Sequence, residues 1–244
     1  GSSSSGAKQL VDVSSEDLED VNKIMQQAMR ERTEGIILYQ AGTAAHMAGK
    51  YREAGERLDA AAKAAESLKD HRLLAESLIM LGYNMKKLAN YPASLKAFDQ
   101  SIAAASLAAS RDRKYLEGGA TLGKGITHNE MGNLVQARQL FEEAKALSTE
   151  AGDLAGEASA ASNLSALLVN HEPHKARQML ERANKLRYQL FEAAASPSER
   201  FEAKRSWAGT MTNLAGVVFA QEGMEASLPY YKGALEMAEA TSAV

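Results

Sequence analysis

The segment LGYNMKKLANYPASLKAFDQS, residues 81–101, decides the fold of this chain. It sets a large residue beside a small one at Leu81-Gly82, and after a short turn it places Tyr91, Phe98 and Ser101 in a second apolar stretch. The small residue lets a first helix approach a second one closely, and the aromatic residue fills the space against the helix that follows. The segment therefore predicts a hairpin of two helices joined by a tight turn.

The same pattern recurs along the chain at intervals of 40, 43, 40 and 50 residues, counted between successive small residues. A single hairpin of this kind cannot bury its apolar face alone, so neighbouring hairpins must stack. Three of the turns contain a glycine, which can adopt the backbone angles that end a helix. The five small residues are Gly42, Gly82, Gly125, Ser165 and Ala215, and the three turn glycines are Gly49, Gly132 and Gly223.

Residue usage predicts that the chain is all-α. Ala, Leu, Glu, Lys, Met and Gln, which are good helix formers, dominate the sequence, and strand-like alternation of β-branched residues is missing. The four prolines each fall where we predict the start of a helix, and none interrupts a long periodic stretch. They are Pro92, Pro173, Pro197 and Pro229.

The five copies, from about residue 36 to residue 239, resemble the tetratricopeptide repeat. The usual period of that repeat is about 34 residues. The longer intervals here, together with the run from Ala151-Gly152-Asp153 to Asn163-Leu164, resemble the subclass of about 40 residues found in kinesin light chains and Pins-type polarity adaptors. The resemblance implies an α-α superhelix, a solenoid of about five helical hairpins.

We expect residues 1–13 to be a flexible tag or linker and residues 14–244 to be a single repeat domain. A further helix, capped by Ser14 or Ser15 and carrying Leu18, Val21 and Ile24 on one face, is expected to cover the first hairpin. Ser196-Pro197-Ser198-Glu199 predicts the start of a long helix after a long helix that ends near Ala195. The expected hairpins span residues 35–68, 73–110, 113–150, 153–195 and 197–241.

Composition and charge argue against several classes of function. The formal net charge of −3 gives no global reason to bind nucleic acid, and no apolar run approaches the length that membrane insertion requires. The absence of cysteine removes disulfides and thiolate chemistry, and it is consistent with a reducing compartment. We expect a cytoplasmic protein.

Two motifs resemble a nucleotide-binding site and a metal site, but their sequence context argues against both functions. GGATLGKG, residues 118–125, nearly matches a phosphate-binding loop, but Gly125 replaces the required hydroxyl residue and no strand precedes it. His171 and His174 flank Pro173 without an evident third metal ligand. We therefore predict no enzyme activity, no cofactor and no metal site. Four glycines in one helix imply either a soft helix or unusually close backbone packing.

Basic and aromatic residues in the last two hairpins are interpreted as structural. Acidic residues are mixed in among the basic ones, so a solvated outer helix face is predicted, with a basic docking patch as the alternative. Trp207 and Tyr230-Tyr231 are predicted to pack between helices, although an exposed Tyr230 would suit an oligomer contact. The basic residues are Lys175, Arg177, Arg182, Lys185 and Arg187.

The better candidate site is the concave face, which the first helix of each hairpin lines in a stacked array. Asn163 and Asn213 directly precede the leucine of the repeat pattern. In the resembled subclass, asparagines at that position bind the backbone of an extended peptide; a surface or packing role is the alternative. The first three copies have Gln40, Met80 and Gly123 there, which confines such a ladder to the C-terminal half. The predicted partner-binding residues are Tyr39, Thr43, Tyr83, Lys86, Lys87, Asn129, Asn163, Asn170 and Asn213.

The sequence therefore predicts an adaptor that binds another protein, as an extended peptide or a helix, in the concave groove. Tyr39, Thr43 and Tyr83 stand where a chaperone-tail-binding repeat has its carboxylate clamp, so that type of binding is not expected. The alternative is a structural, self-assembling subunit that forms a homo-oligomer through its end helices, with Leu228, Tyr230 and Leu235 in the contact.

Overall fold

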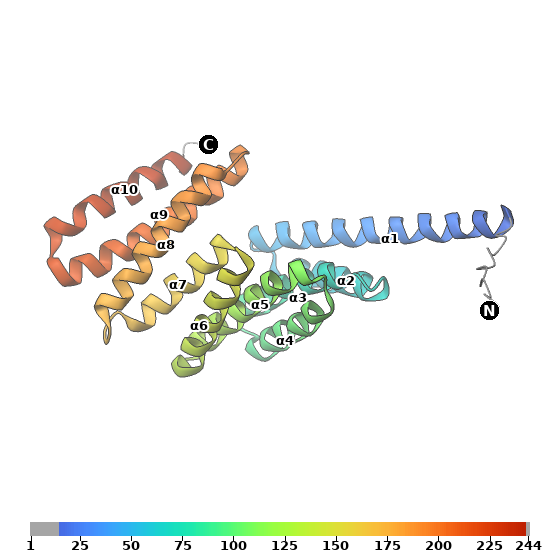
Figure 1. Ribbon diagram of the computed structural model, residues 1–244, viewed down its shortest axis with the longest axis horizontal. Coiled ribbons are helices and arrows are strands. Elements are labelled where there is room, and N and C mark those ends of the chain that lie inside the picture. The colour runs from blue at the N-terminus through green and yellow to red at the C-terminus, as the bar shows by residue number, and fades with distance from the viewer. Residues whose placement is uncertain (1–14, 243–244) are drawn as a thin grey trace, which may run out of the picture.

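The computed structural model describes residues 15–242, and these residues form ten α-helices and no strand. Consecutive helices pair into five hairpins that lie side by side along the long axis of the molecule (Figure 1). The predicted all-α superhelix is confirmed, while the predicted linker at residues 1–13 lies outside the described residues. The helices are α1 (Ser15–Met47), α2 (Tyr51–Ser67), α3 (His71–Lys87), α4 (Tyr91–Leu107), α5 (Ser110–Glu130), α6 (Leu134–Ala151), α7 (Leu154–Leu168), α8 (Pro173–Ala193), α9 (Pro197–Glu222) and α10 (Met224–Ser242).

Close approach between the helices of a hairpin depends on the small residues. A methyl group at Gly82 would lie 2.7 Å from Phe98, and one at Gly125 would lie 2.7 Å from Phe141. A methyl group at Gly123 would lie closer still to Phe98, so this ring of α4 is held between glycines of α3 and α5. The glycine-rich part of α5 is therefore a site of close backbone packing, one of the two outcomes expected from the sequence.

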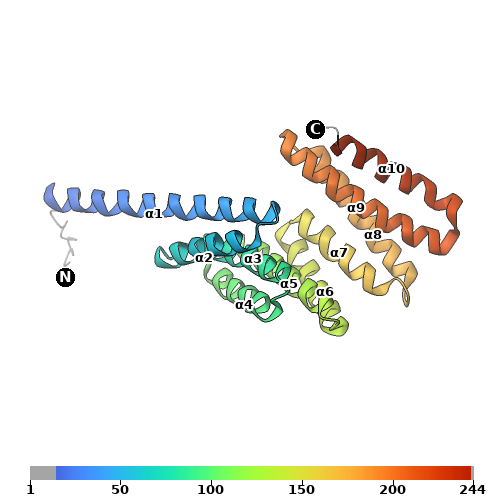
Figure 2. The same ribbon diagram turned by 180° about the vertical axis from the view of Figure 1, so that it is seen from behind.

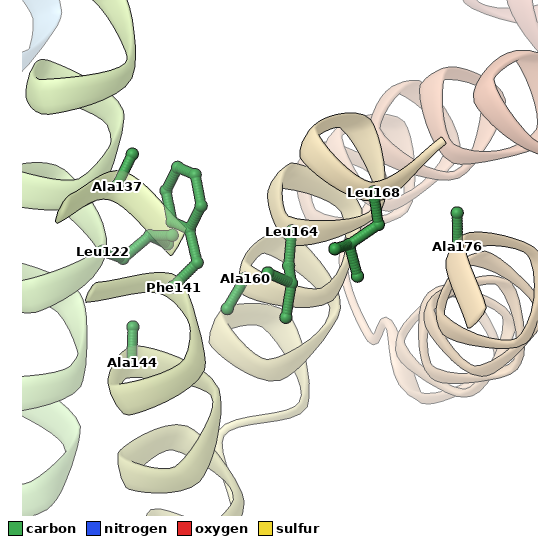
Figure 3. Packing of buried hydrophobic residues seen from close by; sticks show 8 residues of the cluster. All are labelled: Leu122, Ala137, Phe141, Ala144, Ala160, Leu164, Leu168 and Ala176. Carbon is green, nitrogen blue, oxygen red and sulfur yellow. The ribbon is translucent and has the colours of Figure 1, made fainter. Parts of the chain in front are cut away.

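The apolar core consists of several clusters, each of which joins neighbouring helices. One cluster joins α5, α6, α7 and α8, with Phe141 fully buried at its centre and Ile126 packed against its side. Figure 3 shows this cluster, in which alanines and leucines of neighbouring helices face one another. Its buried members are Leu122, Ala137, Phe141, Ala144, Ala160, Leu164, Leu168 and Ala176.

Buried polar groups also join neighbouring hairpins. Asn84 on α3 is fully buried, its amide nitrogen donates to the carbonyl oxygen of Tyr51 at 2.8 Å, and its amide oxygen lies 3.0 Å from Nδ1 of His46. Thr127 on α5 lies one repeat later and shares a hydrogen bond of 3.1 Å with Ser94. Because an unpaired buried polar group is costly, these contacts favour one register between successive hairpins.

Local sequence sets the helix ends. Gly49, Gly132 and Gly223 have φ angles of 75°, 80° and 87°, so each predicted turn glycine has the positive φ that glycine adopts readily. The predicted start of α9 is confirmed: Ser196 accepts from the backbone N–H of Glu199, and Glu199 accepts from the N–H of Ser196. The backbone N–H groups of Ser196 and Ala195 both donate to the carboxylate of Glu199 and lower its pKa below the usual value.

The expected N-terminal capping helix is not a separate element. α1 is a single helix of 33 residues, and Figures 1 and 2 show its first half extending past the other helices. Residues 15–34 contain neither proline nor glycine, so nothing stops the helix, and Gly35 then packs against Leu73 and Ala64. Leu18, Val21 and Ile24 are therefore exposed instead of covering the first hairpin.

One proline also differs from expectation. Pro229 lies inside α10 and not at its start, because α10 already begins at Met224, directly after the turn at Gly223. Its missing N–H therefore falls in the second turn of the helix. The other three prolines lie at the first or second position of α4, α8 and α9.

Candidate functional site

Eight of the nine predicted groove residues lie on the first helices of hairpins, and Asn170 lies in the turn that follows α7. Tyr39 and Thr43 belong to α1, and the lysines and Tyr83 belong to α3. Asn129, Asn163 and Asn213 lie on α5, α7 and α9, respectively. Successive first helices from α1 to α7 are in contact with one another, so these residues form a row along the array and not a single pocket. That they bind a partner stays a prediction.

Most of the row in the N-terminal half is already engaged within the fold. The ring of Tyr83 meets the ring of Phe98 edge-on at 5.2 Å, and burial raises the pKa of Tyr83 to about 12. The ammonium group of Lys86 pairs with Glu130 at 2.6 Å, and the side chain of Lys86 is 9% exposed. Tyr39 is half-buried, and burial raises its pKa. These side chains contribute more to packing than to an open binding surface.

Asn213 is an accessible amide in the C-terminal half of the row. It is exposed, and its side chain makes no hydrogen bond with any residue in the range 15–242. It lines a pocket of about 320 Å³ between α7 and α9, together with Ala166 and Gly216. Asn163 is half-buried, and its amide nitrogen donates to the carbonyl oxygen of Ser159 at 2.8 Å. The two asparagines are therefore not equivalent: Asn213 has its full hydrogen-bonding capacity, and Asn163 has part of it.

The remaining predicted residues are accessible to different degrees. Lys87 and Asn170 are exposed, and Asn129 is half-buried. Within the described part of the chain, no ion pair includes Lys87, and no side-chain hydrogen bond includes Asn129 or Asn170. Thr43 Oγ1 is buried. Lys87, Asn129 and Asn170 are thus available to a partner, whereas Thr43 is not.

The junction between the fourth and fifth hairpins is more open than the others. α7 and α9 make far less contact with each other than α3 makes with α5. Two pockets open between α7 and α9 with residues of α8 in their lining: the pocket at Asn213, and a second one of about 530 Å³ that includes Ala155, Arg187 and Ser206. Ser206 and Asn213 are seven residues apart on α9, which places them on one face of the helix.

Sequence analysis missed Arg187 by assigning it to a solvated face. In the structure it is half-buried, lines the second pocket and donates from Nη2 to Ser159 Oγ at 2.7 Å. The helical period indicated that Arg187 lies on the buried face of α8, because it follows the buried Leu180 by seven residues and the buried Ala183 by four. Arg182 is exposed, as expected of a solvated face, and it also pairs at 3.0 Å with the buried Glu157.

The motifs that resembled chemical sites are structural in form. Residues 118–125 lie inside α5, where their N–H groups belong to the helix and not to a phosphate-binding loop. No group of three or more His, Asp or Glu residues within 15–242 could hold a metal ion. Over the same range, no helix is both long and apolar enough to cross a membrane.

No protein-family model matches the sequence, and no curated protein matches it. Solved structures with the same fold do exist. BtubC (BKLC) from P. vanneervenii superposes with a TM-score of 0.69 at 16% identity, covering 94% of this chain and 90% of that one. RapI in its apo form superposes with a TM-score of 0.61 at 15% identity, covering 92% of this chain and 59% of that one. A putative kinesin light chain of Podosopora anserina with TPR-like repeats superposes with a TM-score of 0.54 at 13% identity. The match covers 84% of this chain and 94% of that one.

These similarities, together with the five stacked hairpins, define the class of the protein. The chain has a tetratricopeptide-type helical repeat fold, and the resemblance inferred from the repeat pattern is confirmed. At these identities the comparisons establish the fold, and function must be argued from the site itself.

Proposed function

We propose that this protein is an adaptor that binds an extended segment of a partner protein between α7 and α9. The observation that carries the proposal is the amide of Asn213, which lines an open pocket without a hydrogen-bond partner among residues 15–242. An amide offers both a donor and an acceptor, so it can pair with a peptide unit whatever side chain that unit carries. Nothing in the proposal requires a reaction to be catalysed.

The surroundings of Asn213 support an extended occupant. Ala166, Val169 and Val217 give the pocket apolar walls, and Gly216 adds no side chain to block it. Asn163, on the neighbouring first helix, retains an unpaired amide oxygen that can accept a second peptide N–H. A backbone held at two points along its length would run across the junction, with Lys87, Asn129 and Asn170 left to influence selectivity.

Replacing Asn163 and Asn213 together with alanine is expected to weaken partner binding at least tenfold, because two peptide units lose their hydrogen bonds. The probe is a peptide selected from a random library on the wild-type protein, with affinity measured by fluorescence anisotropy. Asn22→Ala, an exposed asparagine on the projecting half of α1, is the matched control and should leave the affinity unchanged. Unchanged affinity in the double variant, with its circular dichroism intact, would contradict binding in this groove.

Self-association through the end helices is a second candidate function, and exposed apolar side chains favour it. On α1, Val21 and Met25 are 50% and 56% exposed, and they share one helix face with Leu18 and Ile24. The residues from 21 to 28 that flank this face include one charge, Lys23, which pairs with Glu19 at 3.2 Å. A second copy of α1 can therefore pack antiparallel without opposing like charges.

The far end offers a different surface from the one expected. Tyr230 packs against Leu214 and Val218, so the exposed aromatic residue of α10 is Tyr231, which is 40% exposed. Leu228 and Leu235 are exposed as predicted.

Val21→Glu together with Met25→Glu is expected to abolish dimer formation, because charged residues would then oppose each other across the α1 seam. Sedimentation velocity at increasing concentration should show a weak dimer for the wild-type protein, since a single helix pair buries close to the lower limit of about 1,000 Å² for a specific interface. Leu228→Glu is the control for the α10 surface. A wild-type protein that remains monomeric at every concentration would rule this function out.

A further inference from the structure

Arg187 is a partly buried cation that forms no ion pair with any acidic residue in the range 15–242. Two other arginines of α8 do have one: Arg177 pairs with Glu181 and Arg182 pairs with Glu157, both at 3.0 Å. Arg187 makes one hydrogen bond, to Ser159 Oγ, and its Nε is buried without a partner. A guanidinium has five N–H donors and remains charged at neutral pH, so most of its capacity is unused.

The carboxylates nearest to Arg187 are committed to other groups. Asp153 caps α7 by accepting from the backbone N–H of Gly156 at 3.0 Å. Glu199 accepts from the backbone N–H groups of Ala195 and Ser196, and Glu202 pairs with Arg205 at 2.6 Å. Burial lowers the pKa of Arg187, and the nearby Asp153 offsets this only in part. Each of these acids has a role that fixes its position, and none of them forms an ion pair with Arg187.

The pocket that Arg187 lines has the shape and polarity for a short acidic side chain. Its volume is about 530 Å³, and its walls include Leu190, Ala193 and Ala203. Such walls accommodate an aliphatic stem, and a guanidinium binds a carboxylate through two parallel hydrogen bonds. Glu199 and Glu202 also line the pocket, so a carboxylate with a single negative charge fits beside Arg187 better than a phosphate group, whose charge is about −2.

We propose that Arg187 binds the carboxylate of an aspartate or glutamate side chain of the partner segment, in the pocket between the end of α8 and the start of α9. The inference rests on the proposed groove function and adds a chemical requirement to it. Glu202, Ser206 and Asn213 share one face of α9. The distance along α9 from the Arg187 pocket to Asn213 corresponds to about three to five residues of an extended peptide. The acidic residue should therefore lie that far from the peptide unit held by Asn213.

A small probe tests the pocket without any peptide. In side-chain ¹⁵N spectra of the full chain, the Nε–H signal of Arg187 is assigned by its loss in Arg187→Lys. We expect N-acetyl-aspartate N-methylamide to shift this signal saturably and the matched asparagine derivative to leave it in place. The inference is overturned if the two derivatives have the same effect, because the carboxylate would then make no difference.

A second experiment places the acid within a bound segment. Peptides are selected from a random library on the wild-type protein and measured against Arg187→Gln, with Lys185→Gln as the control for an exposed cation on the same helix. We expect at least a tenfold loss for Arg187→Gln, less than a twofold change for Lys185→Gln, and the same tenfold loss when the acidic peptide residue becomes its amide.

The two experiments separate failure of this inference from failure of the groove. Peptides that depend on Asn163 and Asn213 but bind Arg187→Gln normally would overturn the carboxylate inference and leave the groove intact. If the aspartyl probe shifts Arg187 while no selected peptide depends on Asn163 or Asn213, the carboxylate site stands and the groove proposal fails.

Discussion

Gly123→Ala is expected to destabilise the protein by about 2 kcal/mol, although alanine is the better helix former. The added methyl group would overlap the ring of Phe98 at both Cε1 and Cζ. The ring cannot move away, because it already packs directly against Gly82 of α3, where not even a methyl group would fit. Overpacking of this kind costs about 1–3 kcal/mol or more, which exceeds the gain in helix propensity of about 1 kcal/mol. Urea denaturation followed by circular dichroism measures the loss.

Gly209→Ala is the matched control, since Gly209 lies inside α9 with nothing near the position of an added methyl group. It should stabilise the protein by up to about 1 kcal/mol, because only helix propensity changes. Opposite signs for the two substitutions would show that close packing, and not glycine itself, is what α5 requires. Equal and stabilising effects would contradict the contact between α4 and α5.

The repeat could be predicted from sequence because its signal is local and recurs. Gly82 and Phe98 lie in one hairpin, and similar pairs in the other hairpins, such as Gly125 and Phe141, support the same interpretation. The start of α9 was equally predictable, since Ser196, Pro197 and Glu199 act within a single turn. The continuity of α1 was not predictable, because a serine that marks the start of a helix does not indicate where that helix ends.

The candidate site was only partly predictable. Sequence register placed Asn213 on a first helix, but its open pocket arises from the separation of α7 and α9, which depends on how whole hairpins pack. Arg187 lay on the apolar stripe of α8, yet counting charges grouped it with exposed neighbours. Whether a charged side chain on such a stripe reaches solvent is decided by the helices beside it, here α7 and α9.

Phe98→Ala is expected to cost about 3–5 kcal/mol, the largest effect of any substitution considered. Phe98 is fully buried, it faces Gly82 and Gly123 from two different hairpins, and Tyr83 meets its ring edge-on. Because each hairpin is stabilised by its neighbours, the cavity should weaken α3, α4 and α5 together. Hydrogen exchange should accelerate in these three helices first. Phe219→Ala is the control, since Phe219 is 47% exposed and its loss should cost less than about 1 kcal/mol.

The double variant Phe98→Ala, Gly123→Ala tests whether the two predictions have one cause. Without the ring, the methyl group at residue 123 has no atom to overlap and instead enters the space that the ring has left. The second substitution should then be neutral or stabilising, so that the two effects fail to add by about 2 kcal/mol or more. Additive effects would mean that Gly123 and Phe98 act independently, and the close approach of α4 to α5 would need another explanation. Coupling of the expected sign would establish that the glycine at position 123 is required to admit the ring of Phe98, which gives this part of residues 118–125 a structural role.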